Sequence, residues 1–198
     1  MTTSHRLPQV IQLIDQANAD DPNKAYIGKT EYPKEQLYSK RMSERLAVFY
    51  PDTPETLQIA AHAQHIQRWK SPRDSYPMNR SGYLQWRREL GKFHAKVTTE
   101  LMDKVGYEAA EQDIVTSLLT KQQIKLNPLA QALEDVICLV FIEYYLEDFA
   151  AKHSEEKLIS IIKKTWAKMS DRGQQAALKL PIKEELLTFV GNALNQNS

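Results

Sequence analysis

Apolar residues recur every three or four positions along most of the chain, which is the spacing of helices with one buried face. The first such stretch predicts a helix over residues 5–18, and the polar run from Asp20 to Asn23 ends it. A second helix is expected from Pro33 to about residue 49, because proline suits a first helical turn. The N-terminal quarter of the chain is therefore expected to hold two helices joined by a polar connector through Gly28 and Lys29.

The middle of the chain predicts three more helices around one long loop. The first of them should start after a cap at Asp52 or Thr53 and run to about Trp69. Residues 70–82 then form a loop rich in proline, serine and arginine. Ordered loops of this length often carry function. The two helices after the loop are expected at about 83–105 and 107–120.

A central helix is predicted in the second half of the chain. Asn127 can cap a helix that opens at Pro128. From Leu133 to Phe149 this stretch is apolar on almost every side, which is typical of a buried helix. Short amphipathic helices follow it. No segment shows the alternation of a half-buried strand, and no internal repeat is present.

These patterns predict an all-α fold, a single-domain helical bundle of about seven to nine helices. A length of 198 residues is typical of one domain. We expect that domain to cover residues 1–198, with its core at about 33–150. C-terminal helices within 154–196 would pack onto this core.

Composition limits the cellular location and the classes of partner that we expect for this protein. The net charge is only +1, whereas a protein that binds nucleic acid by bulk charge would be more basic. A local basic patch stays open, so nucleic acid remains a candidate partner. Cys138 is the single cysteine and lies among apolar residues, which indicates a buried thiol and a cytoplasmic protein. No apolar run approaches the ~20 residues of a membrane span, so no membrane partner is expected.

Three histidines are candidates for chemistry. His62 and His65 lie three positions apart on the predicted third helix, so their side chains point about 60° apart and could face one centre. His94 falls on the apolar stripe of the fourth helix, where an imidazole needs a partner. The alternative is that these are core histidines satisfied by ordinary hydrogen bonds.

Asp135 is a candidate carboxylate because it lies within the most apolar predicted helix. A buried carboxylate is costly unless it is paired or binds a metal. Together with His65 and His94 it would suit a divalent Zn, Mn, Fe or Ni ion. The same groups could form an acid–base cluster without metal. A structural salt bridge is the other interpretation.

An arginine-rich and aromatic segment joins the two histidine helices. Arginine binds phosphate or carboxylate through two parallel hydrogen bonds, and aromatic rings stack on bases. The alternative is that these residues pack the loop and cap helix ends. The candidate ligand-binding residues are Arg68, Arg73, Arg80, Trp86 and Arg87.

Several segments resemble a known family. Most of the chain is covered by the resemblance, and the motifs between residues 63 and 95 are fairly specific. The segments are Leu-Tyr-Ser-Lys-Arg-Met-Ser (37–43), Ala-Gln-His-Ile-Gln-Arg-Trp (63–69), Pro-Arg-Asp-Ser-Tyr-Pro (72–77), Arg-Ser-Gly-Tyr-Leu-Gln-Trp-Arg (80–87) and Phe-His-Ala (93–95). They resemble the family catalogued as domain of unknown function 4202, a description that implies no activity.

The helix order is also distantly similar to that of HD-type metal-dependent phosphohydrolases. That resemblance implies an HD-domain-like fold. If the resemblance holds, Gln64-His65 would occupy the position of the family's His-Asp pair. His94 would correspond to a following histidine, and Asp135 to the late aspartate. Two departures are visible: no aspartate follows His65, and the early helix offers Tyr38 and Ser39 in place of a histidine.

Residues and resemblance together predict a degenerate, HD-like, metal-dependent hydrolase acting on a phosphorylated small molecule or nucleotide. His65, His94 and Asp135 would be catalytic, and His62 would join them as a metal ligand. The alternative is a non-catalytic module that binds a nucleotide, RNA or an acidic partner through residues 68–88. A metal-dependent oxidase is a third possibility. The sequence leaves the oligomeric state open.

Overall fold

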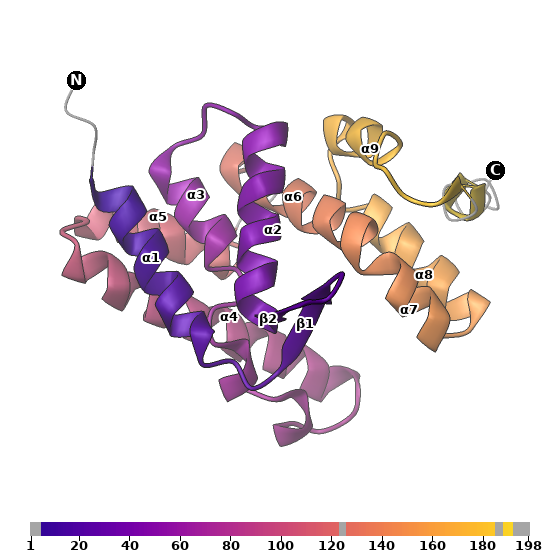
Figure 1. The fold of residues 1–198 in the computed structure, drawn as a ribbon, viewed down its shortest axis with the longest axis horizontal. Helices are drawn as coiled ribbons and strands as arrows, with labels where there is room; N and C mark the ends of the chain where they lie inside the picture. The colour runs from indigo at the N-terminus through magenta and orange to yellow at the C-terminus, as the bar shows by residue number, and fades with distance from the viewer. Residues whose placement is uncertain (1–4, 123–125, 185–187, 192–198) are drawn as a thin grey trace. The chain divides into compact units, whose positions relative to one another are not determined.

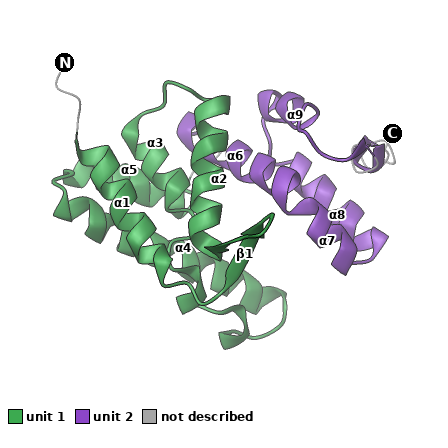
Figure 2. Cartoon of the chain, in the orientation of Figure 1, with its two compact units in different colours: residues 1–123 green, residues 124–198 purple. Residues whose placement is uncertain are grey.

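The computed structural model describes residues 5–122, 126–184 and 188–191. These residues are mostly helical, which confirms the predicted all-α class, and nine α-helices lie within them. The chain forms two compact units, residues 1–123 and 124–198, each described by itself (Figure 2). Within the described ranges, no helix is both long and apolar enough to cross a membrane.

Unit 1 is a helical bundle with a small hairpin (Figure 1). Its core is formed where α1, α2 and α3 meet and where α3 and α4 pack against α5. Val10, Met42 and Leu57 are fully buried there. The elements of unit 1 are α1 (Arg6–Ala19), β1 (Lys24–Ile27), β2 (Thr30–Pro33), α2 (Lys34–Phe49), α3 (Glu55–His62), the 3₁₀ turns η1 (Arg68–Lys70) and η2 (Arg73–Ser75), α4 (Arg80–Lys104) and α5 (Ala109–Leu119).

The hairpin of β1 and β2 corrects the expectation that no strand would be found. The two strands pair antiparallel, with Lys24 opposite Pro33 and Ile27 opposite Thr30. Each has four residues and is largely exposed, so neither shows the alternation that marks a half-buried strand. The turn uses Gly28 in the left-handed region, at φ 59°.

The predicted third helix was wrong at both ends. It begins at Glu55 after Pro54, without the expected side-chain cap from Asp52 or Thr53. It stops at His62 instead of continuing to Trp69, because the chain turns and Gln67 adopts a left-handed conformation with φ 50°. His65 therefore lies in a turn after α3 and not one helical step beyond His62.

Asn18 holds this turn. Its side chain is fully buried, its Oδ1 accepts the Gln67 backbone N–H at 2.8 Å, and its Nδ2 donates to Ser39 Oγ at 3.2 Å. The amide thus joins α1, α2 and the turn that carries His65. Glycine usually supplies left-handed backbone, so the bond to Gln67 offsets a local strain.

Asp21 sets the start of α2. Its Oδ2 accepts the backbone N–H of Glu35 at 2.9 Å, and its Oδ1 accepts from Asn23. A carboxylate at this place satisfies a donor in the first turn and interacts well with the helix dipole. Because α2 starts here, Glu35 lies in its first turn with a buried side chain.

Unit 2 is built on α6, and Asn127 caps it as predicted: its Oδ1 accepts from the N–H groups of Leu129 and Ala130. Cys138 is buried on α6, as predicted. The predicted helices up to residue 196 extend into residues 185–187 and 192–198, which lie outside the described residues. The helices of unit 2 are α6 (Pro128–Tyr144), α7 (Leu146–Lys152), α8 (Glu155–Trp166) and α9 (Asp171–Ala177).

Replacing Asn18 tests the turn. Asn18→Ala leaves the Gln67 N–H and the buried Ser39 hydroxyl without this partner, so the free energy of unfolding should fall by about 1–3 kcal/mol. Gln16→Ala, at an exposed position of the same helix, is the control and should change it by less than about 0.5 kcal/mol. Urea denaturation measures both. Equal effects of the two substitutions would contradict the role given to Asn18.

Candidate functional site

His65 and His94 lie side by side in unit 1. Their ring centroids are 6.2 Å apart, and the ring planes are inclined by 47°. Beside them lies a cavity of about 220 Å³, here called the histidine cavity. It is formed by one face of α4, the end of α5 and the turn after α3. Its lining residues are Gln64, His65, Arg87, Arg88, Leu90, Gly91, His94, Leu119, Thr120 and Lys121.

His65 is oriented by groups on both sides of its ring. Its Nδ1 lies 3.1 Å from Glu35 Oε2, and one guanidinium nitrogen of Arg68 lies 3.0 Å from Nε2 and 3.3 Å from Nδ1. A carboxylate only accepts, so the contact with Glu35 places the ring proton on Nδ1 and leaves Nε2 as the acceptor nearest Arg68. The Tyr38 ring stacks on the imidazole at 3.8 Å. His65 is therefore a neutral, fixed acceptor.

Burial lowers the pKa of His65 well below its ordinary value of 6.5, and Arg68, Arg87 and Lys121 lower it further. Burial raises the pKa of Glu35, while the nearby positive charge of Arg68 opposes that shift. The cations next to the cavity thus keep His65 uncharged and favour the carboxylate form of Glu35.

His94 has one nitrogen in use and one unsatisfied. The side chain is only 3% exposed, and its ring donates to the backbone of Gln64. Its Nε2 is buried and has no hydrogen-bond partner within the described part of the chain. Gln64 also lines the histidine cavity, and its Oε1 is likewise buried without a hydrogen-bond partner among the described residues. A ligand that bonded to these two atoms would gain from doing so, because an unsatisfied buried polar atom costs about 1–3 kcal/mol.

The potential in the histidine cavity is positive. Burial is the main reason that the pKa of His94 lies well below 6.5, and His65, Arg68 and Arg87 lower it further. Arg87, Arg88 and Lys121 line the cavity, and none of its described lining residues carries a carboxylate. A site with several cations and no carboxylate favours an anion.

The residues predicted to bind a ligand divide into two groups. Arg87 lines the histidine cavity, and Arg68 reaches His65 from its edge. Arg73, in contrast, donates to the carbonyls of Tyr76, Pro77 and Asn79, which closes its own loop. Trp86 likewise serves the scaffold, because it is buried and donates to the Ser71 carbonyl. Arg80 is the exposed first residue of α4 and does not line the histidine cavity.

Gly82 shows how tightly this loop is built. A Cβ at Gly82 would lie 2.1 Å from the Pro77 carbonyl oxygen, so only glycine fits. The side chain of Asn79 caps α4 by accepting the Gly82 N–H. The loop at residues 70–82 therefore uses its polar groups internally, which supports the interpretation that it packs and caps.

His62 faces a different cavity from His65. Its Nδ1 lies 2.8 Å from Ser43 Oγ, and its Nε2 lies 3.0 Å from Asp15 Oδ1. The predicted common centre of His62 and His65 required one continuous helix, and the turn at 63–67 removes that geometry. The two histidines thus belong to separate sites of unit 1.

Asp135 has its own partners in unit 2. Its Oδ1 accepts from the Ser170 backbone N–H at 2.8 Å and from Gln131 Nε2 at 3.0 Å, and its Oδ2 accepts from Ser170 Oγ at 2.6 Å. A Cβ at Gly173 would lie 2.7 Å from Oδ1, so glycine permits this close approach. Asp135 therefore anchors the start of α9 to α6.

Residues 8–190 match a protein family described as "Domain of unknown function (DUF4202)". The chain belongs to this family. The match includes both histidine sites, and the predicted family resemblance is confirmed. No curated protein and no solved structure matches the chain. The resemblance to HD-type phosphohydrolases stays a prediction.

In this DUF4202 protein, two of the predicted metal ligands, His62 and His65, already have other partners. Both nitrogens of His62 and of His65 have partners, and the partner of His65 Nε2 is the cation Arg68. A divalent site needs three or four converging donors. In the described ranges, no three His, Cys, Asp or Glu side chains group to hold an ion. His94 Nε2 would supply only one metal ligand.

Three side chains at the site were not predicted from the sequence as functional residues. Glu35 carries no signal, because an acid in a first helical turn is common on exposed faces. Lys121 lies beyond α5 in the left-handed region, at φ 57°. Gln64 was noted only because it precedes His65. The burial of the Gln64 amide becomes visible only once the turn after α3 is known.

Acid should destabilise this protein through its two buried histidines. Above pH 6.5 both are neutral in the folded and unfolded states, so their contribution to the free energy of unfolding is fully present. Below 6.5 the unfolded chain gains protons first, because the folded pKa values of His65 and His94 are lower. The free energy of unfolding should then fall by up to about 1.4 kcal/mol per pH unit for each histidine.

His94→Gln isolates one of these contributions. Between pH 6.5 and 5.5 the variant should lose stability less steeply than the wild type, by up to about 1.4 kcal/mol per pH unit. Urea denaturation at several pH values gives the slopes. His5→Gln replaces an exposed histidine of the same unit and serves as the control. Identical slopes for wild type and His94→Gln would show that His94 is not held neutral.

Asp135→Ala tests the structural role of the buried carboxylate. It removes the acceptor of three hydrogen bonds, two of them from Ser170, so the free energy of unfolding should fall by on the order of 3 kcal/mol. Asp148→Ala, at an exposed position of α7, should have almost no effect. Denaturant titration distinguishes them. A wild-type midpoint for Asp135→Ala would contradict the anchoring role.

Proposed function

We propose that unit 1 binds a small phosphorylated molecule in the histidine cavity and does so without a metal ion. The observation that carries the proposal is the buried, unpartnered Nε2 of His94 beside Arg87 and Lys121. The proposal keeps the phosphorylated substrate class expected from the sequence. It assigns the neutralisation of the phosphate charge to protein cations in place of the predicted metal.

A phosphate monoester suits both the charge and the acceptors of the cavity. Its second pKa is about 6, so near neutrality one oxygen can carry a proton while the others remain charged. That O–H can donate to the neutral Nε2 of His94. The charged oxygens can accept from the guanidinium of Arg87, whose fork matches two phosphate oxygens. An unprotonated anion would leave Nε2 unsatisfied.

Gln64 adds selectivity for the rest of the ligand. Gln64 lines the cavity, and its Oε1 is a buried acceptor that a hydroxyl or amine next to the phosphate could satisfy. The volume of about 220 Å³ is below the roughly 300–1,000 Å³ of sites for drug-sized ligands. A small phosphorylated polyol or amine fits these limits better than a nucleotide.

Binding through residues 68–88 as an open loop is less well supported. Arg73 and Trp86 donate to backbone carbonyls of that same loop. They would have to give up these bonds to contact RNA or an acidic partner. The ligand-binding contribution of the segment therefore comes from Arg87 and, through His65, from Arg68.

Calorimetric titration with inorganic phosphate and with glycerol phosphate tests the proposal. We expect one site, binding that persists with a chelator, and an affinity that decreases as pH rises above about 6, because a proton must accompany the anion. Arg87→Ala should weaken binding by about 10–100-fold, the equivalent of a charged hydrogen bond. Arg80→Ala removes the same charge from an exposed position of α4 and should retain wild-type affinity.

Two results would overturn the proposal. Equal affinity in Arg87→Ala and wild type would show that phosphate binds elsewhere. Loss of binding on chelation, restored by Zn or Mn, would support the metal-dependent alternative. Assay of inorganic phosphate released from glycerol phosphate in the same samples separates a hydrolase from a binding protein.

A further inference from the structure

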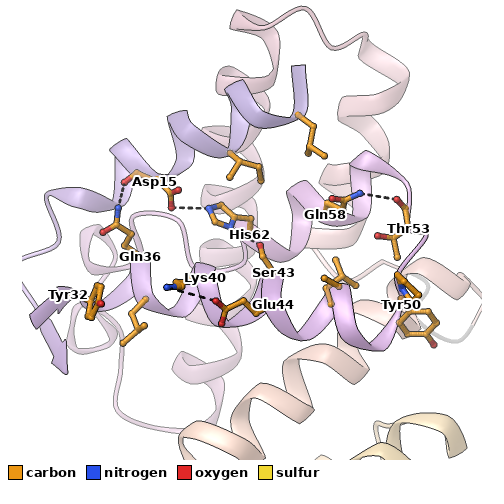
Figure 3. A pocket seen from close by; sticks show the side chains of 16 residues that line it. Asp15, Tyr32, Gln36, Lys40, Ser43, Glu44, Tyr50, Thr53, Gln58 and His62 are labelled. Carbon is orange, nitrogen blue, oxygen red and sulfur yellow. Dashed lines mark hydrogen bonds and ion pairs between the residues drawn. The ribbon is translucent and has the colours of Figure 1, made fainter. Parts of the chain in front are cut away.

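Unit 1 contains a second cavity with a chain of three polar side chains on its wall. It has a volume of about 510 Å³ and lies against α1, α2 and the end of α3 (Figure 3). We call it the serine cavity. Ser43 on α2, His62 on α3 and Asp15 on α1 all line it, and hydrogen bonds join them in that order.

Asp15 determines which nitrogen of His62 acts as a base. A carboxylate only accepts, so the 3.0 Å contact places the proton of His62 on Nε2. Nδ1 is then unprotonated and accepts the hydroxyl proton of Ser43, 2.8 Å away. This is the relation of nucleophile, base and orienting acid that activates a serine for acyl transfer. The two imidazole nitrogens are chemically able to exchange these roles.

Ser43 is directed at His62 rather than at its own helix. A serine inside a helix commonly donates to the carbonyl four residues earlier. Here Ser43 Oγ is instead joined to His62 Nδ1, and the residue is partly exposed at the cavity wall. His62 itself is only 4% exposed, which keeps competing water away from the ring. The hydroxyl is thus both oriented and accessible.

The rest of the cavity indicates an ester substrate. Leu7, Ile11 and Leu46 contribute apolar wall that can hold an acyl chain. Its volume lies within the range of sites for small molecules. Lys40 lies one turn before Ser43 on the same face of α2 and also lines the cavity, where it is ion-paired with Glu44 at 3.9 Å (Figure 3).

We propose that the serine cavity is a hydrolytic site for carboxylic esters with a short apolar acyl group. Ser43 Oγ bonds to the carbonyl carbon, and its proton passes to His62 Nδ1. The ester C–O bond then breaks, and that proton goes to the departing alcohol. Water next attacks the acyl group, giving a proton to His62, and the bond to Ser43 Oγ breaks as the proton returns. Ester and water become acid and alcohol.

The site is independent of the histidine cavity. The lining residues of the two cavities do not overlap. His62 and His65 both contribute, but each to its own cavity. A protein of this arrangement combines an ester-cleaving centre with a separate place for a phosphorylated ligand.

An alkyl fluorophosphonate, which forms a bond to activated serines, tests the proposal on the full-length protein. Mass spectrometry of the intact chain and of its peptides should find one adduct, on Ser43. Because the adduct is mapped in the wild type, the result does not depend on how a variant folds. Hydrolysis of 4-nitrophenyl butyrate should accompany labelling and stop when labelling is complete.

Substitutions separate an active serine from a structural hydrogen bond. Asp15→Asn can donate to Nε2, which moves the ring proton to Nδ1, and should slow labelling and hydrolysis by at least about 100-fold without unfolding the chain. Ser43→Ala should abolish both. Ser81→Ala, an exposed serine on α4, should label at the wild-type rate. No adduct on Ser43 of the wild type, or equal rates in wild type and Asp15→Asn, would overturn the proposal.

Discussion

The buried side chain of Asn18 is the constraint on which the functional part of unit 1 depends. It accepts the backbone N–H of Gln67 and donates to Ser39, so it ties the turn after α3 to α1 and α2. Without that turn, His62 and His65 would sit on one helix and point in neighbouring directions. With it, each imidazole faces a different cavity. A single amide in the core thereby decides that unit 1 has two candidate sites.

His62 and His65 are each oriented by a carboxylate, but their second partners differ. In each case a carboxylate fixes the ring tautomer, Asp15 for His62 and Glu35 for His65. The remaining nitrogen of His62 meets a hydroxyl, which gives a base next to a nucleophile. That of His65 meets the cation Arg68, which gives a neutral acceptor in a positive environment. The chemistry of an imidazole here depends on its second neighbour.

His94 differs from both because one of its nitrogens has no protein partner among the described residues. Buried histidines normally use both nitrogens, as His62 does. Burial and adjacent cations together hold the ring neutral. An unprotonated acceptor surrounded by positive charge is matched by an anion that brings its own proton. This combination is the reason for proposing a phosphate monoester over an anion that has lost all its protons.

The sequence by itself determined the helical class, the cap at Asn127, the buried Cys138 and the family, since these depend on local periodicity, local capping or a string of residues. It also located His94 correctly on a buried face, because helical spacing identifies such positions. The end of α3, the hairpin and the partners of Asp15, Glu35 and Asp135 were decided only by the tertiary structure. These features rest on contacts between residues distant in sequence, such as Asn18 with Gln67 and Asp135 with Ser170. Periodicity shows which side chains are buried, but a hydrogen bond across elements decides which of them meet.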